Sequence, residues 1–205
     1  MTKYVGAIAT SGVPLNTKKC PACEADTIES IPLEKSAFQK PPMRATRPIT
    51  TVCQTCKTDF GGSELIIKTA EQVAKGLDAT DLSDEAIFRR IANPKPLPKV
   101  FDPVSLEAVV TSRTLVNYQH HHWFHCKSCF KVTRRTPKGN GCRMFMPKEA
   151  CTDTKWTNDN RIEMQRAPGN EYVNTYVPIV NALFKCNHDI KFLGAGEGIK
   201  LNEFY

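Results

Sequence analysis

Residues 120–142 hold an unusual concentration of side chains that bind metals. Four of the five histidines and three of the nine cysteines in this 205-residue chain lie within this stretch. Imidazole and thiolate are the ligands that a tetrahedral zinc ion prefers. The intervening residues are mostly basic or turn-forming, so burial would contribute little to ordering them. The composition therefore predicts a zinc site here.

Spacing alone leaves the four ligands of this site open. The candidates are His120, His122, His125, Cys126, Cys129 and Cys142. Cys129 and Cys142 are the preferred thiolates, and two of the three imidazoles would complete the site. Cys126 competes with them, because Cys126-x2-Cys129 is itself a knuckle spacing. The alternative is a solvated histidine run beside reduced core thiols.

Two Cys-x2-Cys knuckles form a second candidate site, made of Cys20, Cys23, Cys53 and Cys56. Each knuckle lets two sulfurs reach one metal from one tight loop, and the pair predicts a four-cysteine zinc ribbon. Gly61 and Gly62 follow the second knuckle and can adopt the positive φ that such turns need. The alternative is four unrelated cysteines. A ribbon indicates zinc but not DNA, because ribbons also serve structural and protein-binding roles.

Basic and aromatic residues accompany the histidine-rich site. They are Lys127, Lys131, Arg134, Arg135, Lys138 and Arg143, with Trp123 and Phe124 nearby. Basic side chains can contact phosphates, and aromatic rings can stack on bases. The net charge of +7 also favours an anionic partner. Single-stranded DNA is therefore the predicted partner. A second basic, proline-rich stretch at residues 37–48 is either a further phosphate contact or a solvated loop.

Cysteine usage and hydropathy predict the compartment. Nine cysteines without a signal-peptide pattern near the N-terminus indicate a reducing environment, so we expect a nuclear or intracellular protein that is not secreted. No run approaches 18 apolar residues, so no membrane span is expected.

Several motifs in residues 101–205 resemble those of Helitron transposon proteins, in the same order. They are the histidine run, Cys129-Phe130-Lys131, the Cys142–Pro147 hexad Cys-Arg-Met-Phe-Met-Pro, Val173-Asn-x-Tyr176, and the Cys186–Phe192 run Cys-Asn-His-Asp-Ile-Lys-Phe. The family hexad is usually Cys-Arg-Phe-Gly-Phe-Pro, so the hydrophobic positions are only partly kept. The family consists of large rolling-circle replication initiators joined to helicases. The resemblance implies a protein that acts on DNA.

The catalytic motifs of that family are missing from these 205 residues. The family cuts DNA with a Tyr-Tyr-x-x-x-Tyr-x-x-Lys motif and a metal held by a His-hydrophobic-His pair. Tyr205 matches only the first position of the tyrosine motif, and no His-hydrophobic-His pair or Walker A motif occurs. Covalent attack on phosphate needs both a nucleophile and a metal that stabilises charge. We therefore expect a non-catalytic fragment that precedes the tyrosine motif.

Helices and strands must position these sites. Hydrophobic periodicity and capping residues predict helices at 63–77, 83–92, 102–117 and 176–186. Alternation predicts strands at 161–165 and 189–193. Cys186 is expected to be a buried packing thiol. The glycine run at 194–198 lacks the context of a phosphate loop.

These patterns together predict an α+β chain of small zinc-stabilised modules. The expected layout is a flexible leader (1–16), a zinc-ribbon-like module (17–62), a helical segment with a proline-rich linker (63–99) and a Helitron-like Cys/His module (100–205). The expected function is zinc-dependent nucleic-acid binding without catalysis. The alternatives are a protein-interaction module, a metal-dependent hydrolase or nicking enzyme, and a truncated transposon copy with no activity of its own.

Overall fold

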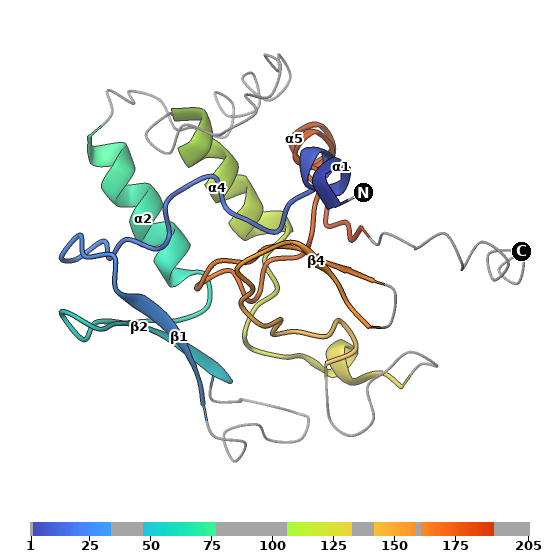
Figure 1. Ribbon diagram of the computed structural model, residues 1–205, viewed down its shortest axis with the longest axis horizontal. Helices are drawn as coiled ribbons and strands as arrows, with labels where there is room; N and C mark the ends of the chain where they lie inside the picture. The colour runs from blue at the N-terminus through green and yellow to red at the C-terminus, as the bar shows by residue number, and fades with distance from the viewer. Residues whose placement is uncertain (1, 34–46, 77–105, 133–141, 159–160, 191–205) are drawn as a thin grey trace, which may run out of the picture.

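The computed structural model describes residues 2–33, 47–76, 106–132, 142–158 and 161–190. Helices and small antiparallel sheets alternate along these residues, as expected for an α+β chain (Figure 1). The predicted helix at 83–92, the linker at 93–99 and the glycine run at 194–198 lie outside the described residues. Within the described residues, every helix is too short or too polar to cross a lipid bilayer.

A three-stranded antiparallel sheet carries the first cysteine group. It consists of β1 (Ile28–Pro32), β2 (Ile49–Cys53) and β3 (Asp59–Phe60), in that order across the sheet. Ile28 pairs with Cys53, and Thr51 pairs with Phe60. The β-branched residues of β1 and β2 suit a half-buried pleated surface. Because β2 ends at Cys53, the sheet fixes the start of the second knuckle.

Helices α2 (Glu64–Lys75) and α4 (Leu106–Tyr118) pack side by side beyond this sheet (Figure 1). Helix α2 matches the predicted helix closely, although the Ser63 side chain makes no capping hydrogen bond. Its buried residues follow helical spacing: Leu65, Ile66, Thr69 and Ala70. The apolar core between the helices also takes residues from the N-terminal segment and the C-terminal half, namely Leu15, Val173 and Tyr176.

The N-terminal segment is packed, in contrast to the predicted flexible leader. Helix α1 (Thr2–Ile8) precedes an isolated β-bridge between Thr10 and Tyr176. The Tyr176 hydroxyl donates to the Gly12 carbonyl, and the Ser11 hydroxyl donates to the Gln165 carbonyl. Ser11 is fully buried. These contacts with residues more than 150 positions away supply the order that local sequence could not reveal.

The C-terminal half is built from short elements. They are η2 (Lys127–Phe130), β4 (Lys155–Trp156), β5 (Ile162–Glu163) and α5 (Pro178–Phe184). Strand β5 lies within the strand predicted at 161–165, and α5 lies within the helix predicted at 176–186. Asp189 and Ile190 are not in a strand, and the rest of the predicted strand at 189–193 lies outside the described residues.

Gly169 lets the C-terminal half approach α2 and the sheet. Its φ is +89°, and an added Cβ would lie 2.5 Å from Cδ2 of Leu65. Its N–H donates to the Ser30 hydroxyl in β1 at 3.3 Å. A glycine is needed here for both reasons, because a side chain would be strained and would displace Leu65. The predicted Cys/His module therefore contacts both the predicted zinc-ribbon-like module and the helical segment at Gly169.

His188 supports the start of α5. The Val177 N–H at the N-terminal boundary of α5 donates to Nε2 of His188 at 3.0 Å. Nδ1 lies 3.2 Å from the Cys186 carbonyl. We expect His188→Ala to lower the free energy of unfolding of α5 by about 1 kcal/mol, the typical loss for one such bond.

The measurement for this variant is hydrogen exchange at the α5 amides. His122→Ala, which removes an exposed imidazole elsewhere, is the control. Unchanged α5 protection in His188→Ala would show that the bond to Val177 does not stabilise the helix.

Candidate metal centres

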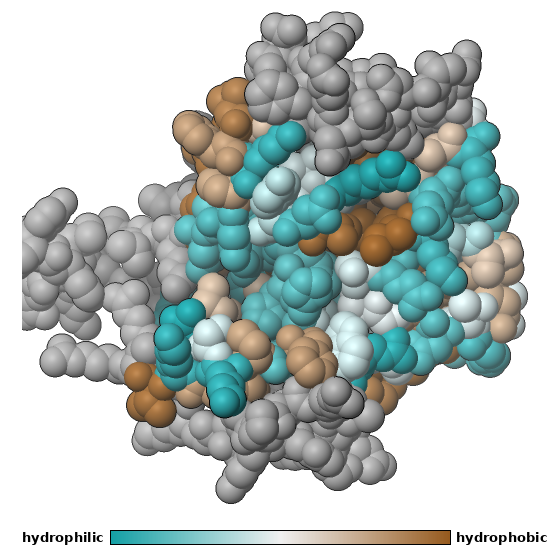
Figure 2. Space-filling view, turned by 180° about the vertical axis from the view of Figure 1, so that it is seen from behind, coloured by the Kyte–Doolittle hydropathy of each residue, from teal (hydrophilic) through white to brown (hydrophobic). Residues whose placement is uncertain are grey.

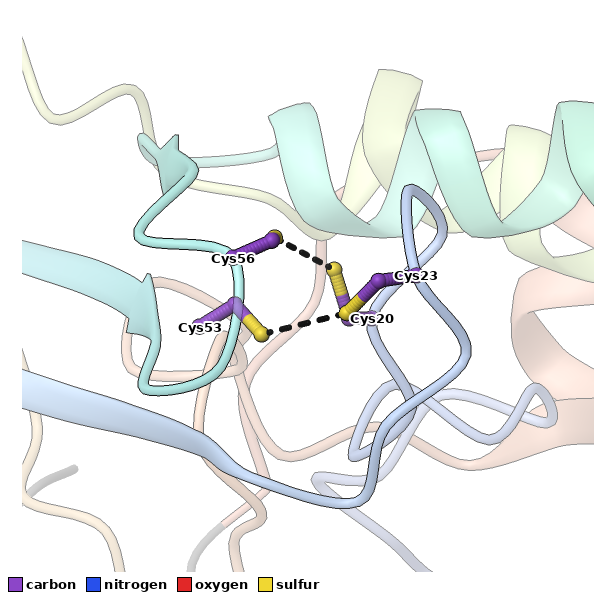
Figure 3. Close-up of side chains that lie close together, drawn as sticks. All are labelled: Cys20, Cys23, Cys53 and Cys56. Carbon is purple, nitrogen blue, oxygen red and sulfur yellow. Dashed lines mark hydrogen bonds between the residues drawn. The ribbon is translucent and has the colours of Figure 1, made fainter.

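The four cysteines of the two knuckles converge on one point. Cys20 and Cys23 lie on one loop and face Cys53 and Cys56 on another (Figure 3). The Sγ atoms of Cys20 and Cys56 are 3.6 Å apart, as are those of Cys23 and Cys53. A tetrahedral ion with metal–sulfur distances of ~2.3 Å requires sulfur–sulfur separations of ~3.8 Å. This four-cysteine group could therefore hold a metal ion.

Both knuckles close through the same backbone pattern. The Glu24 N–H donates to the Cys20 carbonyl, and the Lys57 N–H donates to the Cys53 carbonyl, each at 2.8 Å. Glu24 and Lys57 directly follow the second cysteine of each knuckle and have φ values of 63° and 59°. The positive φ expected at a glycine is thus taken by Lys57, while Gly62, at 52°, lies just before α2. Matching turns present the two sulfur pairs in matching orientations.

One cysteine of each knuckle faces the core. Cys20 and Cys53 are fully buried and pack with Ile28, Phe60 and Leu65, whereas Cys23 and Cys56 are exposed. This arrangement connects the four-cysteine group directly to the sheet and to α2. A metal ion bound by the four cysteines would therefore stabilise the core that the sheet shares with α2.

The thiols of this group differ in how readily they lose a proton. Burial raises the pKa of Cys20 to about 12. The Cys56 N–H, with further help from the Thr27 hydroxyl, lowers the pKa of Cys53 to about 6. The Thr58 hydroxyl lowers the pKa of Cys56. A metal must displace the remaining thiol protons, so metal affinity falls as the pH falls.

A second group, the histidine–cysteine group, combines His121, His125, Cys129 and Cys142, whose ligand atoms all lie within 4.8 Å of one another. Nε2 of His121 is 3.4 Å from the Cys129 sulfur and 3.7 Å from the Cys142 sulfur. Tetrahedral zinc-like bond lengths require nitrogen–sulfur separations of ~3.6 Å. Cys129 and Cys142 are buried, and His125 is 1% exposed. The histidine–cysteine group could also hold a metal ion.

The tautomer of His121 suits a ligand. Its Nδ1 lies 2.5 Å from the His122 carbonyl, to which it donates. In the neutral ring with its proton on Nδ1, Nε2 presents its lone pair to Cys129 and Cys142. A second hydrogen bond of this kind is what orients ligating histidines in metal sites.

Cys142 is prepared for ligation by its neighbours. Burial raises the pKa of Cys142, but hydrogen bonds from the His125 imidazole and from the N–H groups of Met144 and Met146 lower it. Together these hydrogen bonds outweigh burial, so the net pKa is below the ordinary value. Burial raises the pKa of Cys129 to about 11. In each metal group, therefore, one thiol has a lowered pKa (Cys142, Cys53) and another has a raised pKa (Cys129, Cys20).

His120 and His122, two of the three predicted imidazole candidates, lie outside this group, and His121, which was not among those candidates, lies within it. Helix α4 ends at Tyr118, and His120 forms an isolated β-bridge with Val173. Successive side chains of an extended segment point to opposite sides. His120 and His122 therefore share one side, where they line a hollow beside α2, and His121 turns to the other.

Cys126 stays near the second group without joining it. Its sulfur is exposed, 3.8 Å from the Cys129 sulfur and 2.9 Å from the Ser128 hydroxyl. The Ser128 hydroxyl lowers the pKa of Cys126 to about 7. Among the described residues, Cys126 is thus a fifth donor beside a complete set of four.

The predicted nucleic-acid contacts lie partly within the described residues. Lys127, Lys131 and Arg143 are exposed, Phe124 is 44% exposed and Trp123 is half-buried. Arg134, Arg135 and Lys138 lie outside the described residues. From the second basic stretch, Arg47 pairs with Asp59 at 2.6 Å. Cys186 is exposed, which corrects the expectation of a buried thiol.

Comparison of the chain with protein-family models, with curated proteins and with solved structures finds no match.

Proposed function

We propose that this chain is a zinc-stabilised nucleic-acid-binding module of a Helitron-like rolling-circle transposon protein. Zinc is favoured because tetrahedral sets of four thiolates, or of two imidazoles and two thiolates, suit it best among common divalent ions. The Helitron assignment rests on the order of motifs between His120 and Phe192. The role in nucleic-acid binding rests on the surface around the second metal group.

The observation that carries the binding proposal is the attachment of exposed cations to the histidine–cysteine group. Lys127 and Lys131 flank the ligand Cys129, and Arg143 follows the ligand Cys142. The Arg143 N–H donates to the Cys129 carbonyl at 2.7 Å, which joins these two segments. A metal held by Cys129 and Cys142 would therefore fix three cations on one surface, where they can contact successive phosphates.

Exposed apolar side chains accompany these cations. Phe124 is 44% exposed, Phe145 is 47% exposed and Val132 is 91% exposed. Aromatic rings beside a basic surface suit the stacking of unpaired bases. On the opposite face of the molecule from Figure 1, the described surface is mostly hydrophilic with separate hydrophobic patches (Figure 2). Such a surface suits a polar, charged partner better than a partner that binds through a broad apolar interface.

We propose a structural role for both metals. Each group supplies four protein donors, and a metal with four protein ligands keeps no position for a reactive water. The proposal is therefore binding without cleavage.

We expect the zinc-loaded chain to bind single-stranded DNA with a marked salt dependence. Three phosphate contacts would give a slope of about −2 for log K against log salt, because each contact on a single strand contributes about −0.7. Lys127→Gln and Arg143→Gln should each reduce this slope by about 0.7. Fluorescence anisotropy with a labelled oligonucleotide measures the effect.

Lys75→Gln, which removes an exposed lysine at the end of α2, is the matched control and should leave the slope unchanged. Binding that ignores salt would contradict the electrostatic account, and absence of DNA binding would favour a protein partner. A covalent protein–DNA product with Mg²⁺ or Mn²⁺ would contradict binding without cleavage.

A further inference from the structure

A cavity of about 440 Å³ lies between the N-terminal segment and the C-terminal half, away from both metal groups. Residues 6–18 form one side, and residues 150–154 and 164–170 form the other. Its size falls within the range of small-molecule sites. The contacts that order the N-terminal segment, such as the Thr10–Tyr176 bridge, also build this cavity.

The lining combines positive charge, hydroxyl groups and an apolar wall. Lys18 and Arg166 are its cations, and no aspartate or glutamate lies among the described residues that line it. The hydroxyl groups are those of Thr10, Thr17, Thr152 and Thr154, and the apolar wall includes Ala9, Val13, Leu15, Met164 and Pro168. An anion with an apolar part matches this lining.

Arg166 is a buried cation that lacks a close carboxylate. It is 4% exposed, and its Nη1 donates to the carbonyls of Asn170 at 2.9 Å and Val173 at 2.6 Å. Burial lowers its pKa to about 10, so it stays charged at neutral pH. The charges of Glu171 and Glu163 oppose that lowering of the pKa. In the described part of the chain, however, neither carboxylate forms an ion pair with Arg166 within 4 Å. Buried charges are normally paired, and a guanidinium suits phosphate especially well.

Asn170 adds a second unsatisfied group to the same lining. It is 1% exposed, and its Oδ1 has no hydrogen-bond partner among the described residues. A buried acceptor without a donor is costly, and a ligand hydroxyl or amino group would satisfy it. The cavity thus offers cations for a phosphate and an acceptor for a donor on the same ligand.

We propose that this cavity binds a small organic phosphate that also carries a hydroxyl or amino donor, the chemistry of a mononucleotide. Arg166 and Lys18 contact the phosphate, Asn170 accepts from the sugar or base, and the apolar wall covers the rest. The inference does not depend on the DNA-binding surface, because none of Lys127, Lys131 and Arg143 lines the cavity.

Cys151 provides a direct readout, because it is half-buried and lines the cavity. The zinc-loaded full chain is treated with iodoacetamide at constant ionic strength, and alkylation is quantified by peptide mass spectrometry. The added probes are deoxyadenosine monophosphate, deoxyadenosine and inorganic phosphate. We expect the nucleotide to slow alkylation of Cys151 at least threefold and to leave exposed Cys186 unaffected. Inorganic phosphate should protect less, and the nucleoside should not protect.

Lys18→Gln tests the phosphate contact without disturbing the core, because Lys18 is exposed at the rim. It should raise the nucleotide concentration needed for half-protection at least threefold. Lys19→Gln, the same change at the next residue, should not. Equal protection by nucleoside and nucleotide, no protection of Cys151, or equal behaviour of the two variants would overturn the proposal. Lys127→Gln should retain full protection even if DNA binding fails, so the two proposals are tested separately.

Discussion

Cys53→Ser is expected to unfold the three-stranded sheet. Cys53 is fully buried, ends β2 and lies 3.6 Å from the sulfur of Cys23. Its loss removes one of four ligands, and metal-binding energy in small zinc domains, with apparent values of about 10–16 kcal/mol, is also folding energy. Amide hydrogen exchange over β1 and β2 should rise to nearly unprotected rates. A chelator added to the unaltered chain should produce the same pattern.

Cys186→Ser is the matched control for this change. Cys186 is exposed and lies outside both metal groups of the described chain, so the same chemical replacement should leave sheet protection unchanged. Protected β1 and β2 amides in Cys53→Ser would show that the sheet folds without the four-cysteine metal site.

His121→Ala is expected to release the second metal, whereas His122→Ala should retain it. Nε2 of His121 lies within 3.7 Å of the Cys129 and Cys142 sulfurs, while His122 faces the other side of the extended segment. Loss of this metal should expose residues 142–147 to hydrogen exchange. Cys142→Ser should reproduce the effect of His121→Ala. Metal content and exchange in these variants, with Cys186→Ser as the second control, give the measurement.

Two outcomes would contradict this assignment. If His122→Ala releases the metal and His121→Ala does not, the extended segment has the opposite orientation. If both retain it, Cys126 substitutes as the fourth ligand, because its sulfur lies 3.8 Å from that of Cys129.

The four-cysteine group could be predicted from sequence because both ligand pairs are local. Each Cys-x2-Cys turn fixes two sulfurs by itself, and only the meeting of the two turns requires the fold. Helix α2 was predictable for the same reason, since its buried stripe repeats with helical spacing. Its N-terminal boundary at Ser63 was also correct, but the expected side-chain cap is absent.

The histidine–cysteine group was harder because its ligands depend on which way an extended segment faces. Three adjacent histidines provide two alternating sides, and the bridge between His120 and Val173 selects between them. Val173 lies 53 positions away, so local sequence contains no signal for that choice. The hydrogen bond from His121 to the His122 carbonyl likewise exists only once the backbone is placed.

The order of the N-terminal segment was missed for a similar reason. Its partners, Gln165 and Tyr176, are far along the chain, and α1 has only seven residues. A short helix is marginal by itself and is stabilised by packing. Burial of Cys186 was wrongly predicted, because α5 ends at Phe184 and leaves Cys186 exposed.

Zinc stoichiometry by native mass spectrometry tests the central claim most directly, namely that two closed metal centres stabilise this fold. After purification with zinc, the unaltered chain should contain two ions, and His121→Ala and Cys53→Ser should each contain one. Fewer than two ions in the unaltered chain, or two ions in either variant, would contradict the account.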